Sequence, residues 1–133
     1  MADNEENSEK YDTGMRTRRR VLGESYVDAA EERRTAFDDP FQELIVESAW
    51  GHVWSRPNLT LRERSLITIA LLAAQGHDDE VAMHVRACAN TGATRDDIRE
   101  ALLHVAIYAG VPAANQAIKV AKTALEEIDE DGR

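Results

Sequence analysis

The sequence predicts an all-α fold, a single-domain helical bundle of about six to seven helices that assembles into a homo-oligomer. Helix-capping signals and glycine or proline stops recur along the chain, whereas the strict apolar and polar alternation of a strand is nearly absent. The length of 133 residues suits one domain of ordinary size. We expect a helical domain over residues 10–128, between a flexible acidic tail at residues 1–9 and a flexible tail at residues 129–133.

The first half of the chain predicts one clear helix and two looser ones. Asp39 followed by Pro40 is typical of an N-cap with proline at the first helical position, and it opens a helix that runs to about Trp54. Arg56 closes that helix, because a residue that precedes proline avoids helical dihedral angles. Two looser helices are expected ahead of it, over residues 9–22 and 24–33.

The second half predicts four further helices. Thr60 with Glu63 forms a capping box, in which each side chain bonds to the other residue's backbone N–H. Gly76 ends that helix, because glycine readily adopts the left-handed conformation that terminates helices. Three more helices are expected from Asp78 to Gly92, from Thr94 to Gly110, and from Val111 to about Ile128.

Two of these helices are apolar on more than one face. The helix that starts at Asp39 carries two apolar stripes, and the segment from Leu66 to Ala74 is apolar almost all round. A small bundle cannot bury that much apolar surface by itself, so the pattern predicts contacts between subunits as well as a core. The two stripes are Phe41, Leu44 and Ile45 on one side and Val46, Trp50 and Val53 on the other.

Charge and cysteine content exclude several classes of protein. A formal net charge of −9 argues against a nucleic-acid partner, because phosphate binding needs a basic surface. A single cysteine, Cys88, rules out an intrachain disulfide and fits a reducing compartment. The N-terminus does not resemble a signal peptide, and no apolar stretch approaches the roughly 20 residues of a membrane helix. We therefore expect a cytoplasmic protein with no membrane partner.

The first candidate site lies on the helix that starts at Asp39. Glu47, Trp50 and Trp54 share one face of an α-helix, because they are three and seven residues apart. Burial against the indoles would raise the pKa of the Glu47 carboxyl and make it a general acid or base. In the alternative interpretation both tryptophans are core residues, and Glu47 lies at the edge of that core.

The second candidate site lies on the helix that starts at Asp78. His84 borders an apolar stripe, and Glu80 precedes it by one turn on the same side. A carboxylate in that place can orient the imidazole and raise its pKa, so that it can give or take a proton. The alternative is a structural histidine at the border of the core. His77, Glu80 and His84 lack the spacing of a zinc protease, so we expect no metal, and Cys88 is expected to be inert core.

Four arginines are candidates for binding an anion. Arg62 and Arg64 fall in the first turn of their helix, where the helix dipole disfavours cations. With Arg56 and Arg86 they can clamp carboxylates, which match the guanidinium fork. For any single arginine, pairing with a nearby glutamate is the simpler interpretation, but we expect at least one of the four to bind an anion. The candidate glutamates are Glu43, Glu47, Glu63 and Glu80.

Several segments of the chain resemble motifs of the 4-carboxymuconolactone decarboxylase family. The resemblance follows the family's order from about Tyr11 to Leu125, and five segments in register are more specific than any one of them. The segments are Tyr11 to Gly23, Ala49 to Pro57 (AWGHVWSRP), Arg64 to Ala70 (RSLITIA), Glu80 to Ala87 (ExxxHVRA) and Ile107 to Asn115 (IYAGVPAAN).

The resemblance implies a fold, an activity and roles for residues. It implies an all-helical homo-oligomer, commonly a hexamer, with sites near subunit contacts. It implies cofactor-free decarboxylation of 4-carboxymuconolactone, a dicarboxylate lactone, to β-ketoadipate enol-lactone and CO2 in protocatechuate catabolism. In this interpretation His84, oriented by Glu80, donates the proton, and Glu47 is the second candidate. Three arginines would hold the carboxylates and three aromatic residues would wall the ring: Arg56, Arg64, Arg86, Trp50, Trp54 and Tyr108.

Two departures and two alternatives accompany the resemblance. The wider family includes thiol peroxidases with a Cys-x-x-Cys-x-x-x-His motif, but His77 and Glu80 occupy the two cysteine places when that histidine is set on His84. His52 stands where the decarboxylases are expected to carry an acidic residue. The alternatives are an enzyme of the same fold that acts on another lactone or keto acid, and a non-catalytic helical oligomer that binds an anionic metabolite.

Overall fold

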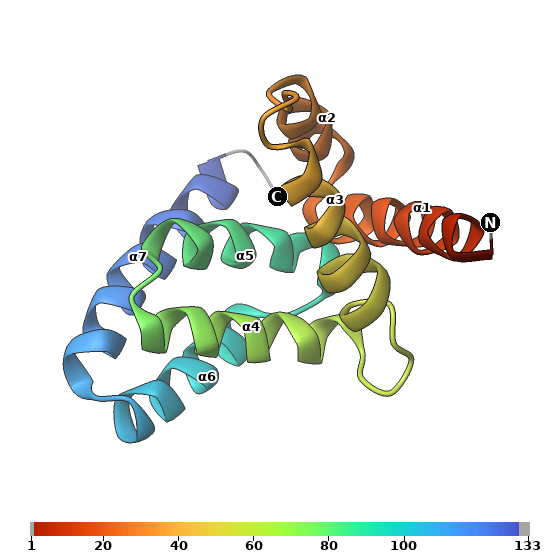
Figure 1. Ribbon diagram of the computed structural model, residues 1–133. Coiled ribbons are helices and arrows are strands. Elements are labelled where there is room, and N and C mark those ends of the chain that lie inside the picture. Colours follow the sequence, from red (N-terminus) through yellow and green to blue (C-terminus); the bar gives the residue numbers. More distant parts are fainter. Residues whose placement is uncertain (1, 131–133) are drawn as a thin grey trace. The chain divides into compact units, whose positions relative to one another are not determined.

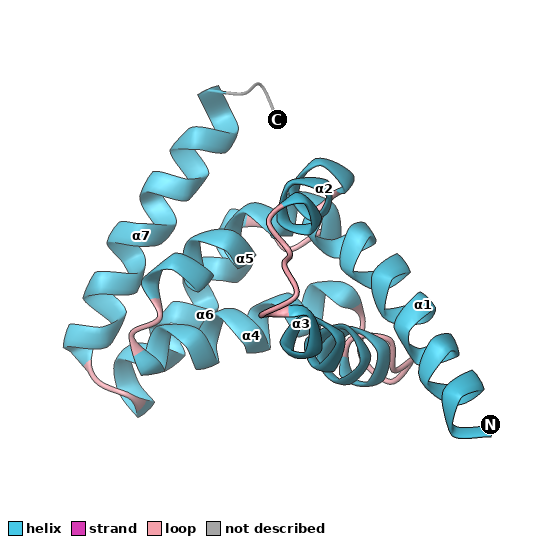
Figure 2. Cartoon of the chain, turned by 45° about the horizontal axis from the view of Figure 1, so that its top comes forward, coloured by secondary structure: helices cyan, strands magenta, loops and turns pink. Residues whose placement is uncertain are grey.

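The computed structural model describes residues 2–130, and within that range the secondary structure is entirely helical (Figure 2). The predicted all-α class is therefore confirmed. The chain groups into two compact units, residues 1–59 and residues 60–133. The single domain expected over residues 10–128 stays a prediction beside this grouping. The first helix begins at Ala2, so most of the acidic stretch expected as a flexible tail is helical, and residues 131–133 lie outside the described range.

The first unit contains both looser helices that the sequence predicts and a third segment whose helix type differs from the prediction. The expected α-helix from Asp39 to about Trp54 is an α-helix only as far as Ile45 and then continues as a π-helix (the yellow continuation of α3 in Figure 1). Its hydrogen bonds span five residues, as in the 2.8 Å bond from Trp54 N to Ala49 O. The elements are α1 (Ala2–Leu22), α2 (Glu24–Glu32), α3 (Asp39–Ile45) and the π-helix η1 (Val46–Val53).

Two glycines let the backbones of α1 and η1 touch. A Cβ atom added at Gly14 of α1 would overlap the carbonyl oxygen of Val46, and one added at Gly51 of η1 would overlap the carbonyl oxygen of Lys10. Any larger residue at either position would force the two helices apart. The buried hydrophobic side chains of this unit are Val21, Val27, Val46, Trp50 and Trp54.

A network of charged side chains joins α1, α2 and α3. The buried Arg18 donates from Nη1 to Oε1 of Glu31 over 3.1 Å. Arg34 donates from Nε to Oδ1 of Asp39 over 2.6 Å and from Nη1 to the Tyr11 hydroxyl over 2.7 Å. Burial lowers the pKa of Arg34, but its hydrogen bonds to Tyr11 and Asp39 raise that pKa further than burial lowers it. The guanidinium therefore stays charged and links three helices.

The second unit contains the four helices that the sequence predicts. The predicted capping box of Thr60 with Glu63 is present, and Thr94 with Asp97 forms a second one. Gly76 ends its helix in the left-handed conformation, at φ 76°. α5 packs against α4 and α7, and α6 packs against the same two helices (Figure 1). The elements are α4 (Leu61–Gln75), α5 (Asp78–Thr91), α6 (Arg95–Tyr108) and α7 (Val111–Glu130).

Two helix starts differ from the prediction by one residue. The N-cap of α3 is Asp38 rather than Asp39, and its carboxylate accepts a 2.7 Å hydrogen bond from the backbone N–H of Thr35. The N-cap of α5 is His77 rather than Asp78. In both cases the acidic residue expected as the cap lies in the first helical turn, where the helix dipole favours a negative charge.

The core of the second unit combines large aliphatic side chains from α4, α5 and α6 with small ones from α7. Ile69, Val85 and Leu102 are at most 2% exposed. The buried residues of α7 are alanines, which allow its backbone to approach its neighbours closely. These alanines are Ala114, Ala117, Ala121 and Ala124.

Large apolar side chains also remain exposed on both units. Phe41 and Leu44 on α3 are 58% and 59% exposed, and Ile67 and Leu71 on α4 are 48% and 57% exposed. These are the two helices that the sequence predicts to be apolar on more than one face. Over the described residues, we find no helix whose length and apolar character would let it cross a membrane.

Replacement of either helix-crossing glycine by alanine should destabilise the first unit. Glycine to alanine inside a helix normally stabilises by roughly 0.5–1 kcal/mol, but the overlap of the new Cβ with Val46 O or Lys10 O should reverse the sign. We expect Gly14→Ala and Gly51→Ala each to lower the free energy of unfolding by about 1–3 kcal/mol. Urea denaturation followed by circular dichroism measures the change.

The matched control is Asp12→Ala, at an exposed position of α1. It should leave the urea midpoint nearly unchanged. If Gly14→Ala proved as stable as the wild-type chain, the close contact between α1 and η1 would be refuted.

Candidate active site

The candidate site residues are divided between the two units. The first unit holds the tryptophan pair with a carboxylate and one arginine, and the second holds the histidine with its neighbours. The first set is Glu47, Trp50, Trp54 and Arg56, and the second is Arg64, Glu80, His84, Arg86 and Tyr108.

The two tryptophans are packed together and buried. Their ring centroids are 5.1 Å apart with a tilt of 31° between the ring planes. Trp50 is 5% exposed and Trp54 is 7% exposed. A tilted aromatic pair at this distance contributes about 0.5–1.5 kcal/mol beyond its area burial. This burial fits the interpretation of both residues as core, and their role as a wall for a ligand stays a prediction.

The position of Glu47 relative to the tryptophans depends on the helix type. Glu47 and Trp50 would share a face in an α-helix, in which residues three apart are neighbours. A π-helix has more residues per turn, so this spacing no longer brings two side chains onto one face. Glu47 is half-buried whereas both tryptophans are buried, and Arg56 is exposed beyond the end of η1. The shared face was therefore predicted from the wrong helical period.

His84 is buried in the second unit, and its environment favours the uncharged imidazole. The side chain lies on α5 among core residues, and the residue is 6% exposed. Burial lowers the pKa of His84 to about 4, although the nearby carboxylate of Glu80 acts to raise it. The expected influence of Glu80 is present, but the expectation of a raised pKa is wrong because desolvation outweighs it. At neutral pH the free chain therefore carries a neutral imidazole, able both to donate and to accept a hydrogen bond.

Two of the four arginines form ion pairs with partners that the sequence did not suggest. Arg62 donates from Nε and Nη2 to both carboxylate oxygens of Asp97, over 2.8 and 2.7 Å. This bidentate contact lowers the pKa of Asp97 and links the first turns of α4 and α6. Arg86 donates from Nη1 to Oε2 of Glu127 over 3.1 Å, in an exposed pair. The ion-pair interpretation holds for both residues, with aspartate and glutamate partners from distant helices.

Tyr108 lies at the end of α6 and is 86% exposed. Its ring stacks with that of His104, one turn earlier, with centroids 6.3 Å apart and 12° between the planes. His104 was left without a role by the sequence, although its spacing of four residues from Tyr108 predicts this contact.

The single cysteine is enclosed in the core of the second unit. Cys88 donates from Sγ to the carbonyl oxygen of His84 over 3.3 Å. Burial raises the pKa of the Cys88 thiol to about 11, so it stays protonated and unreactive at neutral pH. The described residues contain no group of three histidine, cysteine or acidic side chains placed to hold a metal ion.

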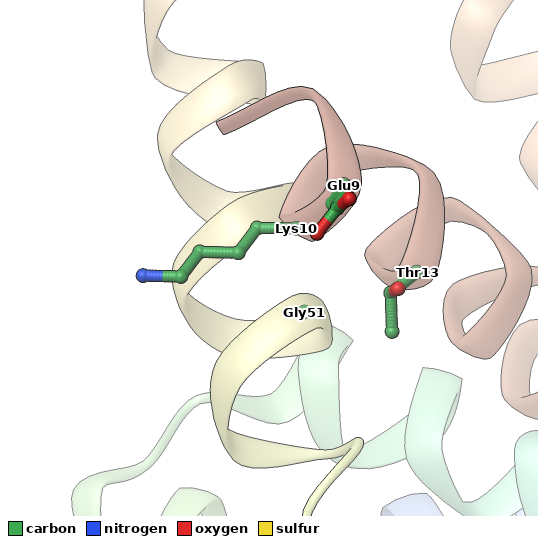
Figure 3. A pocket seen from close by; sticks show the side chains of 4 residues that line it. All are labelled: Glu9, Lys10, Thr13 and Gly51. Atoms are coloured by element: carbon green, nitrogen blue, oxygen red, sulfur yellow. The ribbon is translucent and has the colours of Figure 1, made fainter. Parts of the chain in front are cut away.

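A groove of about 370 Å³ lies between α1 and η1 in the first unit (Figure 3). Its lining comprises Glu9, Lys10 and Thr13 of α1 and Gly51 of η1. The Lys10 side chain points away from Thr13 in this view. The predicted site residues are absent from this lining, so the groove gives no support to their assignment.

Two hydroxyl groups beside the tryptophans were missed by the sequence reasoning. Ser55 donates from Oγ to the carbonyl oxygen of Trp50 over 2.6 Å, and the Thr17 Oγ1 atom lies 2.7 Å from Ser55 Oγ. The available signal was a serine directly after the predicted helix end, where helix carbonyl groups lack backbone partners.

Comparison with known proteins agrees with the resemblance seen in the sequence. The model of the carboxymuconolactone decarboxylase family matches residues 39–123. The chain is 44% identical over 120 residues to a 4-carboxymuconolactone decarboxylase of Acinetobacter baylyi, covering 90% of each chain. It is 41% identical over 122 residues to the nitrosuccinic acid decarboxylase npaB of Metarhizium robertsii, covering 92% of this chain and 85% of the relative.

A shorter match has the same enzyme name. The chain is 44% identical over 43 residues to a 4-carboxymuconolactone decarboxylase of Pseudomonas putida, covering 32% of this chain and 90% of that relative. The family match covers more than half of the chain, and two relatives match nearly its whole length at more than 40% identity. The chain therefore belongs to the carboxymuconolactone decarboxylase family.

Proposed function

We propose that this chain is a carboxy-lyase that converts 4-carboxymuconolactone to β-ketoadipate enol-lactone and CO2, without a cofactor, in the catabolism of aromatic compounds through protocatechuate. The observation that carries this proposal is the 44% identity to the Acinetobacter baylyi 4-carboxymuconolactone decarboxylase across 90% of both chains. The nitrosuccinic acid decarboxylase at 41% identity supports the reaction class independently of the substrate.

The substrate itself supplies the electron sink for this reaction. Loss of CO2 leaves an electron pair that delocalises through the ring alkene into the lactone carbonyl. The protein must then hold a dianion, stabilise the charge that grows on the carbonyl oxygen, and protonate a ring carbon. Buried uncharged donors, guanidinium groups and an apolar wall suit these three tasks.

His84 is the first candidate for the proton donor, and Glu47 is the second. A pKa of about 4 leaves His84 unprotonated in the free enzyme near neutral pH. A bound dianion beside a buried imidazole favours its cationic form and raises its pKa, and Glu80 acts in the same direction. His84 therefore gains its proton on substrate binding and can pass it to the ring carbon.

Three arginines are the candidates for holding the two carboxylates. Arg56 is exposed and Arg64 is half-buried. Arg86 would replace its ion pair with the exposed carboxylate of Glu127 by one with a carboxylate of the substrate. Arg62 is excluded, because its bidentate contact with Asp97 joins two helices. Trp50, Trp54 and Tyr108 would provide apolar surface against the ring.

We further propose that the chain functions as a cytoplasmic homo-oligomer, with a hexamer as the state that the resemblance implies. Exposed apolar side chains on α3, α4 and α6 support self-association, because large apolar surfaces on a water-soluble chain mark contact sites. Examples are Phe41, Leu44, Ile67, Leu71 and Leu103, each 48% to 59% exposed.

A second candidate is decarboxylation of a nitro-substituted dicarboxylic acid. The identity to the nitrosuccinic acid decarboxylase favours it specifically, at 41% over 92% of this chain. A nitro group bonded to the carbon that loses CO2 accepts the electron pair left on that carbon, as the lactone carbonyl does in the first reaction. The same anion clamp and proton donor would serve both substrates.

Purified protein should turn over enzymatically prepared 4-carboxymuconolactone. We expect stoichiometric release of CO2 and enol-lactone, with a kcat/KM higher than that for nitrosuccinate measured in parallel. Enzyme treated with a metal chelator is the control for cofactor independence and should be as active as untreated enzyme. If the folded wild-type chain left the lactone unchanged, the proposed substrate would be wrong.

Replacement of His84 by glutamine should remove most of the activity. Glutamine keeps hydrogen-bonding capacity but does not ionise, so we expect kcat to fall by roughly 10²–10⁴-fold with a smaller change in KM. His77→Gln, at the exposed start of α5, is the control. Undiminished kcat in folded His84→Gln would transfer the proton-donor role to Glu47, to be tested by Glu47→Gln.

The pKa of His84 predicts how stability depends on pH. The folded pKa of about 4 lies below the ordinary histidine pKa of 6.5, so the unfolded chain binds more protons between these two values. This contribution to the free energy of unfolding is full above pH 6.5 and should fall by about 3 kcal/mol as the pH decreases to 4.

Urea denaturation between pH 4 and 7 and NMR titration of the four histidines measure this effect. One histidine, His84, should titrate near pH 4. The low-pH resonance should vanish in His84→Gln. Absence of any histidine that titrates near pH 4 would contradict the burial of His84.

A further inference from the structure

A chain of two hydroxyl groups runs from α1 to the end of the π-helix. Ser55 Oγ lies 2.6 Å from the carbonyl oxygen of Trp50 and 2.7 Å from Thr17 Oγ1. A carbonyl oxygen can only accept, so the single hydroxyl hydrogen of Ser55 is committed to Trp50. Thr17 must then be the donor to Ser55. Hydrogen bonds in such a series polarise and strengthen one another.

The Ser55 side chain caps the C-terminal end of the π-helix by donating to the carbonyl oxygen of Trp50. Trp54 N bonds to Ala49 O, five residues earlier, and Ser55 Oγ bonds to Trp50 O, also five residues earlier. The hydroxyl therefore caps the helix in the register of its own hydrogen bonds. Because Trp54 directly precedes Ser55, this one bond fixes the backbone at both tryptophans.

Thr17 connects this cap to the contact between the two glycines. It follows Gly14 by three residues, so both lie on the face of α1 that meets η1. Figure 3 shows Gly51 of η1 beside this helix. The close approach at Gly14 brings α1 near enough for the Thr17 hydroxyl to reach Ser55. Without Thr17, the cap would lose its connection to α1.

We propose that Thr17 and Ser55 are positioning residues that set the geometry of the Trp50 and Trp54 pair and, through it, the fit of the substrate ring. The kinetic part of this inference rests on the proposed function. An apolar wall contacts the ring equally in the ground state and the transition state, so a displaced wall weakens binding without slowing the chemical step. Loss of either hydroxyl should therefore raise KM and leave kcat unchanged.

The geometry of the pair can be measured without substrate. The sequence contains two tryptophans, so the coupled indole signal in circular dichroism reports on Trp50 and Trp54 directly. Ser55→Ala and Thr17→Val remove one hydroxyl each at nearly constant volume and should both weaken this signal. Thr17→Ser keeps the hydroxyl and should preserve it. The matched control is Ser48→Ala, an exposed serine on the same π-helix, which should also preserve it.

An unchanged indole signal in both Ser55→Ala and Thr17→Val would overturn the proposal. Urea denaturation of each variant establishes that it is folded at the temperature of the measurement. If Ser55→Ala does not fold, Thr17→Val decides the question, because it leaves the bond from Ser55 to Trp50 in place and removes only the connection to α1.

Steady-state kinetics with 4-carboxymuconolactone tests the second half of the proposal. Loss of one hydrogen bond corresponds to roughly a 3- to 10-fold change in an equilibrium constant. We expect KM to rise by that factor in Ser55→Ala and Thr17→Val, with kcat unchanged, and both values to return to wild type in Thr17→Ser. A fall in kcat at constant KM would overturn the assignment to ring binding.

The proposed function and the positioning role of Thr17 and Ser55 can be refuted separately. Absence of turnover by the wild-type chain would refute the proposed substrate, while the indole signal would still decide whether the two hydroxyls position the tryptophans. Turnover with wild-type KM in both variants would leave the proposed function standing and refute the positioning role.

Discussion

The direct contact between the backbones of α1 and η1 governs the organisation of the first unit. Side chains are absent at Gly14 and Gly51, so the Val46 and Lys10 carbonyls approach the opposite helix. Dispersion contacts are short-ranged, and a gap of even half an ångström forfeits a large part of them. The same approach places the Thr17 hydroxyl within 2.7 Å of Ser55 Oγ. The arrangement of the indoles thus follows from two positions that carry no side chain.

In the second unit, burial sets the protonation states of His84 and Cys88. His84 is a buried residue of α5, and burial lowers its pKa in spite of the nearby carboxylate of Glu80. A histidine that is neutral when the site is empty costs less free energy to bury than a cation. This arrangement favours a stable free chain. In the proposed mechanism, protonation of His84 then depends on the arrival of an anion. The same burial keeps the nearby Cys88 thiol protonated.

Local signals in the sequence predict most of the fold, because helix caps and stops act within a few residues. Thr60 with Glu63 and the glycine at position 76 set the bounds of α4 without reference to the rest of the chain. The π-helix was not predicted, since the signals at its ends carry no information about the hydrogen-bond spacing between them. The partners of Arg62 and Arg86 also could not be predicted, because Asp97 and Glu127 lie 35 and 41 residues away.

Binding of a dianion by a chain of net charge −9 places a constraint on the site. The overall charge repels the ligand, so attraction must come from groups within about a Debye length of it, roughly 8 Å at physiological ionic strength. Arg62 cannot contribute a full charge, because both of its hydrogen bonds go to Asp97. In the proposed mechanism, a proton taken up by the buried His84 adds one positive charge where screening by salt is weakest. In the proposed mechanism, one proton therefore both offsets the charge of the bound substrate and supplies the hydrogen that replaces CO2.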